Sequence, residues 1–378
     1  MNDGQVRFIE EVGASLGPIV AVFVAAALLA AILTPLIRRV VLRYRIVDRP
    51  SARRVNTRPI PRSGGLAIAA AFLLVAGAFL ALNANAGWVP VPLTLEPGDF
   101  LALFLGGAAA AALGAIDDLF DLRARWQLAG QLGLALAAVG LGIGIAVVNN
   151  PFGEGVISFS EPFSVGFTVF WIVGMINSIN WIDGLDGLST GIALIASVTL
   201  GLISLTTQVS QPLIAVLCFA LAGALAGFLR WNFHPAKIFS GTSGVQFVGY
   251  TLAVLSIFGS AKVAVALLVL GVPIIDTFWI IVGRLGRGGS PFVPDRSHIH
   301  HRLLDLGLSH RDTVLAIYGI CAALGVLAML VSEVTQLYAF LGVFIVSGLI
   351  LFGPTRGAFR RPEELEAASY EAAETVER

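Results

Sequence analysis

The chain has 378 residues, and its 24 Lys and Arg balance its 24 Asp and Glu, so its formal net charge is zero. Hydrophobic residues make up 57% of the sequence and charged residues 13%, whereas soluble domains carry about 25% charged residues. This composition excludes a soluble globular protein, and we expect a lipid bilayer, not a nucleic acid, as the partner of its surface. The two cysteines, Cys218 and Cys321, lie in apolar runs and are expected to be core residues.

Eleven apolar runs long enough to span a membrane follow one another, which predicts an all-α, polytopic membrane protein with about eleven transmembrane helices. The first run follows a polar, acidic start without the basic segment of a signal peptide, so we interpret it as the first span. The runs cover residues 14–37, 64–82, 99–116, 127–148, 164–181, 188–206, 211–230, 244–259, 261–283, 312–332 and 335–353. We expect one integral membrane domain over 1–354 and a cytoplasmic tail over 355–378.

The Lys and Arg residues indicate how these spans are oriented. When the eleven runs are taken as spans, all 24 basic residues fall on one side of the membrane except Arg7 and Lys262. Cytoplasmic loops carry the excess of Lys and Arg in membrane proteins. We therefore expect the N-terminus outside and the C-terminus in the cytoplasm.

The polar segments of the chain all lie on this basic side, at 48–65, 117–131, 177–188, 234–244 and 295–301. Segments that are distant in sequence but share one membrane face predict an active site that opens to the cytoplasm. A transporter, in contrast, would place polar groups near the midplane of several helices. The one acid inside a span, Asp276, lies about two turns before Arg284 and is expected near the cytoplasmic surface.

Acidic and basic residues lie close together in the sequence directly after the third span. Asp117 and Asp118 are adjacent and Asp121 follows, an arrangement that can hold a divalent cation or supply a base. Arg123 and Arg125 add cations that suit phosphate, and this combination is typical of phosphoryl transfer. A solvated charged loop is the alternative interpretation.

Between the fifth and sixth spans, two amides and two carboxylates recur at three-residue spacing: Asn177, Asn180, Asp183 and Asp186. A charge left in hydrocarbon costs roughly 2.5–3.5 kcal/mol, so packing alone does not explain this row. Its oxygens suit Mg²⁺ or the edge of a nucleobase, and two glycines in the segment let backbone approach a ligand. Helix capping by Asn and Asp explains one or two of the four residues.

A histidine-rich segment follows the ninth span and contains Arg296, His298, His300 and His301. Arginine and imidazole donors fit a diphosphate or a sugar. The spacing of the histidines does not match the i, i+4 pairs of helical zinc sites, but zinc binding and a surface histidine cluster stay as alternatives.

Two glycine-containing segments on the same side lead into spans. Glycine-rich turns at a helix start bind anions through backbone N–H groups, and Phe239, at the beginning of 239–244, can stack on a base. The segment 59–65 contains Arg62 and is otherwise typical of a rigid turn. The basic stretch 38–58 anchors the cytoplasmic side or attracts an anionic lipid head group.

In this order, the motifs resemble those of the polyprenyl-phosphate N-acetylhexosamine-1-phosphate transferases, most closely the bacterial undecaprenyl-phosphate N-acetylglucosamine 1-phosphate transferases. The resemblance extends from about Asp48 to Asp312. It is most specific in Asn-x-x-Asn-x-x-Asp-Gly-x-Asp-Gly-Leu, which begins at Asn177, and in Ser-Pro-Phe-x-Pro-Asp-Arg-x-His-Ile-His-His, which ends at His301. It implies a multi-pass protein of the bacterial inner membrane that requires Mg²⁺, with Mn²⁺ as the alternative ion, and it leaves a homodimer open.

The resemblance also implies a reaction and its residues. A polyprenyl phosphate, undecaprenyl or decaprenyl, attacks the β-phosphate of a UDP-N-acetylhexosamine and releases UMP, the first membrane step of a cell-envelope glycan. Asp117 and Asp118 are expected to activate the lipid phosphate or to position the metal. Asn180 is an implied metal ligand, while Asp183 and Asp186 contact the nucleotide and support the metal. The implied substrate-binding residues are Asn177, Arg62, Arg125, Phe239 (against uracil), Arg296, His298, His300 and His301.

The chain departs from the family pattern at Thr242, where the family usually has an aspartate that is a principal Mg²⁺ ligand. A neutral hydroxyl is a poorer ligand for a hard dication, and Asp183 is the candidate to compensate for it. Milder departures are Asn56 in place of histidine and Arg125 in place of lysine. Two hypotheses follow: a transferase that uses a UDP-N-acetylhexosamine, or a catalytically weakened relative that binds UDP-sugar or lipid phosphate as a regulator or scaffold.

Overall fold

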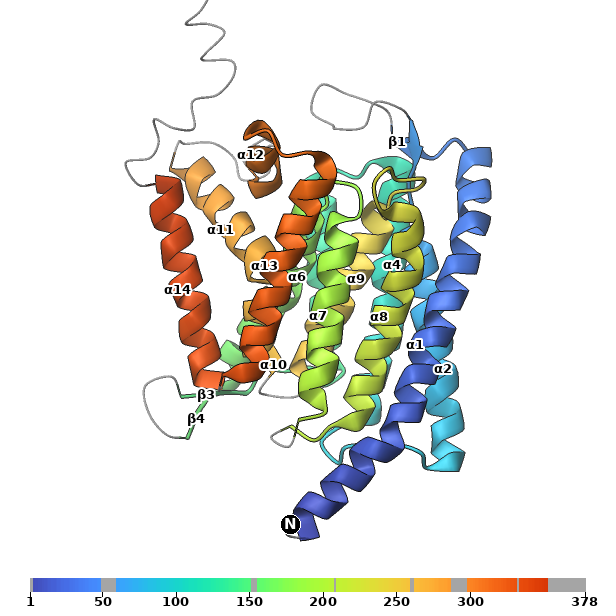
Figure 1. Cartoon of the computed structure of the whole chain (residues 1–378), viewed down its shortest axis with the longest axis vertical. Helices are drawn as coiled ribbons and strands as arrows, with labels where there is room; N and C mark the ends of the chain where they lie inside the picture. The colour runs from blue at the N-terminus through green and yellow to red at the C-terminus, as the bar shows by residue number, and fades with distance from the viewer. Residues whose placement is uncertain are drawn as a thin grey trace, which may run out of the picture.

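The computed structural model describes residues 3–48, 59–150, 155–206, 209–258, 262–286, 298–331 and 333–352, and its long helices run side by side (Figure 1). The long helices are α1 (Asp3–Arg43), α2 (Gly65–Ala86), α4 (Gly107–Phe120), α5 (Ala124–Gly140), α6 (Glu161–Ile182), α7 (Leu188–Ser204), α8 (Pro212–Asn232), α9 (Gly241–Ile257), α11 (Gly271–Leu285), α13 (His310–Leu330) and α14 (Glu333–Phe352). The short pieces are α3 (Pro97–Leu101), the π-helical turn η1 (Ala102–Gly106), α10 (Lys262–Val269) and α12 (Ile299–Asp305). The tail 355–378 lies outside the described residues.

Two small antiparallel hairpins interrupt the predicted all-α architecture, one near each end of the bundle in Figure 1. β1 (Val47–Asp48) pairs with β2 (Ile60–Pro61), and β3 (Val147–Asn149) pairs with β4 (Val156–Ser158). The second hairpin corrects the fourth predicted run, whose last residues form β3 and not helix. The reason is local, because Gly142 has a positive φ of 112°, which stops the helix soon after Gly140.

The prediction of a multi-pass membrane protein is confirmed. Six described helices are long and apolar enough to cross a membrane, and α10 and α11 count as a seventh if the pair, bent by 76°, is one span. Helices occupy all eleven predicted runs, but several are shorter than a full span, among them α7. Eleven crossings and the orientation across the membrane therefore stay predictions.

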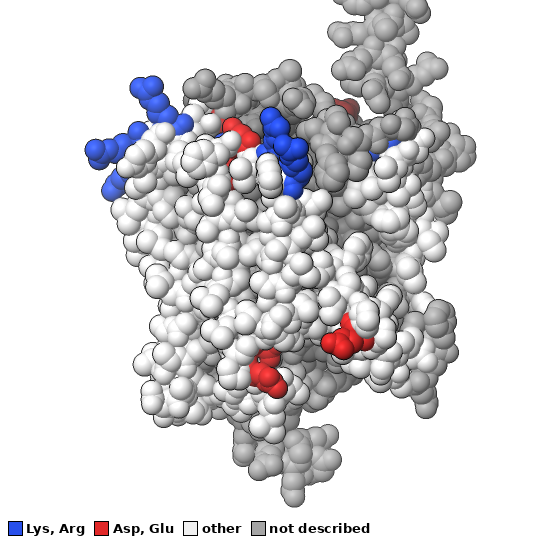
Figure 2. Space-filling model, turned by 180° about the vertical axis from the view of Figure 1, so that it is seen from behind, with Lys and Arg blue, Asp and Glu red and all other residues white. Residues whose placement is uncertain are grey.

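Charge is unevenly distributed along the bundle. In the view from behind, described Lys and Arg side chains gather at the end where β1 and α12 lie in Figure 1, whereas Asp and Glu occur at both ends (Figure 2). This distribution has the asymmetry that the sequence predicts for a cytoplasmic face.

The centre of the bundle is formed by α8 and α9, whose side chains are buried along most of their length. α1 packs directly against α8 through two glycines spaced four residues apart. A Cβ at Gly223 would lie 2.2 Å from the Phe23 carbonyl oxygen, and one at Gly227 would lie 2.1 Å from the Ala27 carbonyl oxygen. Small residues at this spacing allow two membrane helices to approach closely, backbone against backbone.

We therefore expect Gly227→Ala to lower the free energy of unfolding by roughly 1–3 kcal/mol, because the added methyl group forces α1 away from α8. The measurement is the thermal unfolding midpoint of the full chain in detergent. Gly133→Ala is the matched control, since Gly133 in α5 has no atom within 4 Å of a built Cβ, and it should leave the midpoint unchanged or raise it. Equal midpoints for the two variants would contradict the close contact.

Candidate active site

The site is organised around the contact between the last turn of α4 and the first turn of α9. Asp118 is 1% exposed, and its carboxylate accepts hydrogen bonds from the backbone N–H groups of Thr242 (2.8 Å) and Ser243 (3.2 Å) and from the Ser243 hydroxyl (2.8 Å). The first N–H groups of a helix have no partner within the helix and lie at the positive end of its dipole. The Asp118 carboxylate satisfies them and is held in one orientation.

Asp117, the preceding residue, joins α4 to both α9 and α5. Its carboxylate accepts from the Thr242 hydroxyl (2.6 Å), the Leu122 N–H (2.9 Å) and the Gln127 amide (2.7 Å). Thr242, the position of the departure from the family pattern, is therefore a hydrogen-bond donor to the Asp117 carboxylate.

Gly241 makes this contact possible. Its φ is 69°, in the left-handed region, and a Cβ here would lie 2.6 Å from Asp118 Oδ2 and 2.6 Å from the Ser63 nitrogen. A larger residue would both strain the backbone and displace the Asp118 carboxylate. The glycine-containing segment predicted to bind an anion thus holds a carboxylate of the chain itself.

Asp183 lies between α6 and α7 and reaches the same helix start. It accepts hydrogen bonds from the hydroxyls of Ser189 and of Ser240, the residue before α9, the latter at 2.8 Å. Burial raises the pKa of Asp183 above its usual 3.8, and the nearby charges of Asp118 and Asp186 raise it further, while the two hydroxyl donors lower it. Asp183 and Asp118 therefore interact electrostatically beside the first turn of α9.

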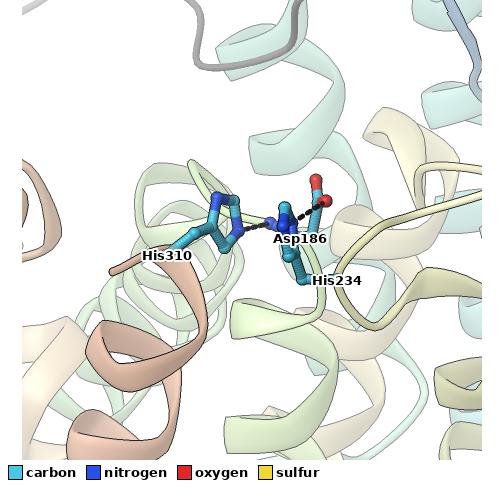
Figure 3. Close-up of side chains that lie close together, drawn as sticks. All are labelled: Asp186, His234 and His310. Atoms are coloured by element: carbon cyan, nitrogen blue, oxygen red, sulfur yellow. Dashed lines mark hydrogen bonds and ion pairs between the residues drawn. The ribbon is translucent and has the colours of Figure 1, made fainter. Parts of the chain in front are cut away.

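Asp186, three residues later, has different partners (Figure 3). Its carboxylate oxygen Oδ2 lies 2.8 Å from His234 Nδ1 and accepts the Ala236 N–H at 3.0 Å. Its own backbone N–H donates to His310 Nε2 at 2.9 Å, and the rings of His234 and His310 stack with centroids 4.2 Å apart. The α6–α7 turn is thereby joined to the loop after α8 and to the start of α13.

The two predicted asparagines lie on α6. The Asn177 amide donates to Gln131 Oε1 on α5 at 2.7 Å and to the Val173 carbonyl at 2.8 Å, so it connects α6 to α5. Among the described residues, the half-buried Asn180 side chain has no hydrogen-bond partner. Its oxygen is available to a ligand.

The end of the histidine-rich segment begins α12, with His298 at the N-cap position, and Asp276 attaches it to α11. His298 Nδ1 lies 2.7 Å from Asp276 Oδ2, and the Ile299 N–H donates to Asp276 Oδ1 at 2.9 Å. The acid inside the ninth run thus contacts the residues at the start of α12, and its position relative to the membrane surface stays a prediction. Next to it, the His300 ring lies against the α6–α7 turn, where a Cβ at Gly184 would be 2.2 Å from His300 Nε2.

The other predicted site residues lie at the edges. Arg62 forms an ion pair of 2.7 Å with the exposed Asp121, and the exposed Arg125 lies 5.6 Å from the centre of the Trp126 ring. The half-buried Phe239 is tied into the site by its backbone, which bonds to Pro61 and Gly64. Arg296 lies outside the described residues.

Sequence reasoning did not single out the serines at 189, 240 and 243 or the histidines at 234 and 310, all of which contact the predicted acids. Serine near a helix start is too common to indicate a site. The two histidines are 76 positions apart, and neither belongs to a spacing pattern that predicts their contact.

The carboxylates around the start of α9 fit Mg²⁺ by the chemistry of their oxygens. Asp117, Asp118 and Asp183 do not form a compact three-ligand group, since their ligand atoms do not all lie within 4.8 Å of one another. Mg²⁺ does not require such a group, because it usually keeps several waters and takes one or two carboxylates together with substrate phosphates. The free oxygen of Asn180 is of the same hard type.

Comparison with known proteins assigns the family. Residues 100–260 match the model for "Glycosyl transferase family 4". The chain is 36% identical, over 88% of its length and 90% of the relative's, to the "Probable undecaprenyl-phosphate N-acetylglucosaminyl 1-phosphate transferase" of Bacillus subtilis. The chain belongs to glycosyl transferase family 4. The range that matches the family model begins in α3 and ends after α9. It includes Thr242 and the acids Asp117, Asp118, Asp183 and Asp186 but not α12, which comes later in the chain.

Relatives of the chain also occur in other bacteria. The chain is 33% identical, over 90% of its length and 89% of the relative's, to the "Decaprenyl-phosphate N-acetylglucosaminephosphotransferase" of Mycolicibacterium smegmatis. It is 28% identical, over 83% of its length and 85% of the relative's, to the "Undecaprenyl-phosphate alpha-N-acetylglucosaminyl 1-phosphate transferase" of Yersinia pestis. The similarity therefore covers most of both chains in each pair.

Removing the Asp276 carboxylate should weaken the attachment of α12 to α11. Asp276→Ala leaves His298 Nδ1 and the Ile299 N–H without these partners, so we expect amide hydrogen exchange across Ile299–Asp305 to accelerate by about tenfold or more. The exposed Glu161, at the start of α6, is the control residue, and Glu161→Ala should leave exchange in α12 unchanged. Unchanged exchange in Asp276→Ala would show that α12 is held by other contacts.

The stability of the protein should fall in mild acid because of His300. Burial lowers the pKa of His300 well below 6.5, and the neighbouring His301, His298 and His310 lower it further. Below pH 6.5 the unfolded chain binds a proton that folded His300 does not, so this contribution is intact above 6.5 and is lost as the pH falls toward the folded pKa. The unfolding midpoint of His300→Gln, compared with the original chain between about pH 7 and 5, should depend less on pH. Parallel pH profiles would rule out this contribution.

Proposed function

We propose that the chain transfers N-acetylhexosamine-1-phosphate, most simply GlcNAc-1-phosphate, from a UDP-sugar to a polyprenyl phosphate and releases UMP. The observation that carries this proposal is the convergence of Asp117, Asp118 and Asp183 on the first turn of α9. It is supported by relatives named for this transfer that match the chain over about nine-tenths of its length.

In the proposed reaction, an oxygen of the lipid phosphate forms a bond to the β-phosphorus of the UDP-sugar. The bond from that phosphorus to the bridging oxygen breaks, and UMP leaves with the electron pair. A phosphate monoester is already largely ionised at pH 7, so the acids act mainly by positioning the reactants and the metal, not by removing a proton.

Mg²⁺ would be held by carboxylates of the Asp117, Asp118 and Asp183 group with the Asn180 oxygen, and when bound it would neutralise charge on the diphosphate. Thr242 orients Asp117 through its hydroxyl, and Ser240 orients Asp183. These fixed donors hold the acids in place before the substrates bind, which reduces the reorganisation needed during reaction.

The sugar-diphosphate side of the site would be formed by α12 and Phe239. His300 and His301 lie on α12, next to the α6–α7 turn that carries Asp183. Arg296 would add a cation for the diphosphate, Arg62 and Arg125 would attract phosphate at the rim, and the Phe239 ring would stack on uracil. Asp186 would support this side through His234, and Asn177 would hold α6 in place through Gln131.

We place the site on the cytoplasmic face of the bacterial inner membrane. The basic end of the bundle supports this orientation, because cytoplasmic loops carry the excess of Lys and Arg (Figure 2). A UDP-sugar would reach the site from the cytoplasm, and the polyprenyl chain would stay in the bilayer.

The test is to incubate the purified chain with UDP-GlcNAc, polyprenyl phosphate and Mg²⁺, to measure UMP release, and to identify the lipid product by its mass. Asp118→Asn should lower turnover by roughly 10²-fold or more, because the site loses a carboxylate that would position the metal and the reactants. Asp99→Asn, at a half-buried position in the first turn of α3 and remote from Asp118 in sequence, should retain turnover. No turnover by the folded chain with any UDP-amino sugar, in Mg²⁺ or Mn²⁺, would refute the proposal.

A second candidate function is a weakened relative that binds UDP-sugar or lipid phosphate as a regulator or scaffold. The neutral Thr242, bonded to Asp117, favours it, because no carboxylate is available at this position for a metal. Thr242→Asp should raise turnover by orders of magnitude if this second function is correct. Comparable rates, measured in the same UMP-release assay, would instead support a fully active transferase.

A further inference from the structure

A second group of ligand atoms lies beside the carboxylates at the start of α9. Asp186, His234 and His310 each offer one ligand atom, and these atoms all lie within 4.8 Å of one another. Within the described part of the chain, no other three acids, histidines or cysteines meet this criterion. The three residues come from the α6–α7 turn, the loop after α8 and the start of α13 (Figure 3).

The chemistry of this group differs from that of Asp117, Asp118 and Asp183. Two imidazole nitrogens and one carboxylate suit transition metals such as Zn²⁺, Co²⁺ or Ni²⁺, whereas Mg²⁺ prefers oxygen ligands only. The ligands of a tetrahedral metal ion are about 3.3 Å apart, given metal–ligand distances near 2.0–2.1 Å. Around an ion, His234 Nδ1 and Asp186 Oδ2, which are 2.8 Å apart, would move apart by about half an ångström. The separations to the His310 ligand atom are at most 4.8 Å and would close by up to about 1.5 Å.

The hydrogen bonds of the group show which bonds a metal ion would replace. His310 Nε2 accepts the Asp186 N–H, so this nitrogen carries no proton, and an ion that binds its lone pair would displace this hydrogen bond. His234 Nδ1 and Asp186 Oδ2 share a hydrogen bond of 2.8 Å. A metal ion would take the place of the proton in that bond, and this proton would move to His234 Nε2 or to solvent.

We propose that Asp186, His234 and His310 bind one transition-metal dication at a site distinct from the proposed Mg²⁺ site. The site is accessible, because the His234 side chain is 40% exposed and the Asp186 side chain is 12% exposed. An ion here would add a common ligand centre to three segments that hydrogen bonds already connect, and it would hold the turn that also carries Asp183. The proposal does not depend on transferase activity.

Cobalt binding tests this proposal without substrates. The full chain, purified in detergent with a histidine-free affinity tag and freed of metal by a chelator, is titrated with Co²⁺ in excess Mg²⁺ while visible absorption is recorded. We expect saturable absorption at one equivalent of Co²⁺. His310→Gln and His234→Gln should each weaken binding by at least tenfold.

The matched control is His300→Gln, because His300 belongs to the other histidine group of the chain, and this variant should bind Co²⁺ as tightly as the original chain. Binding that is lost in His300→Gln but kept in His310→Gln would overturn the proposal, as would the absence of any cobalt absorption.

The unfolding midpoint provides a second measurement. Co²⁺ should raise the unfolding midpoint of the original chain but not that of His310→Gln. If Co²⁺ does not raise the midpoint of the original chain, the three residues are only hydrogen-bonded to one another, and the proposal is wrong.

Discussion

The buried contact between the Asp118 carboxylate and the first turn of α9 is the interaction on which the rest of the site depends. A helix that starts inside a membrane protein must find acceptors for its first N–H groups, because water is scarce there. Asp118 provides them, and Asp117 fixes the Thr242 hydroxyl beside it. Once α9 starts at this point, Ser240 is placed where it can bond to Asp183.

This arrangement gives the acids two roles at once. The same carboxylates that would position a metal and a phosphate also satisfy backbone and hydroxyl donors within the bundle. A substitution at Asp118 therefore changes both the packing of α4 against α9 and the charge of the site. Because a buried donor without a partner costs about 1–3 kcal/mol, activity and stability measurements on such variants have to be read together.

The sequence predicted the features that depend on long, repeated patterns. All eleven apolar runs contain helix, and the motif acids 117, 118 and 183 meet at one end of the bundle. The hairpins and the 76° bend between α10 and α11 were not predicted. A hydropathy pattern shows which segments are apolar but not where the backbone turns at a glycine or at a break between two helices.

The row at three-residue spacing shows why the details of the site were harder to predict. Residues 177 and 180 lie on α6, where a spacing of three keeps side chains on neighbouring positions. The helix ends at Ile182, and beyond it the spacing no longer defines a face. Asp183 therefore bonds to serines, whereas Asp186 bonds to His234, and no sequence pattern marks this divergence.

The close packing of α1 against α8 has a consequence for how the protein is made. The two helices also meet through the Trp231 indole, which donates to the Ala31 carbonyl across 200 positions of sequence. At about 5–20 residues per second, roughly 10–40 s of synthesis separate these two residues. During that interval, the face of α1 that later packs against α8 contacts lipid or the insertion machinery. The contact between α1 and α8 can therefore form only after α8 has been synthesised, and the bundle cannot be completed before then.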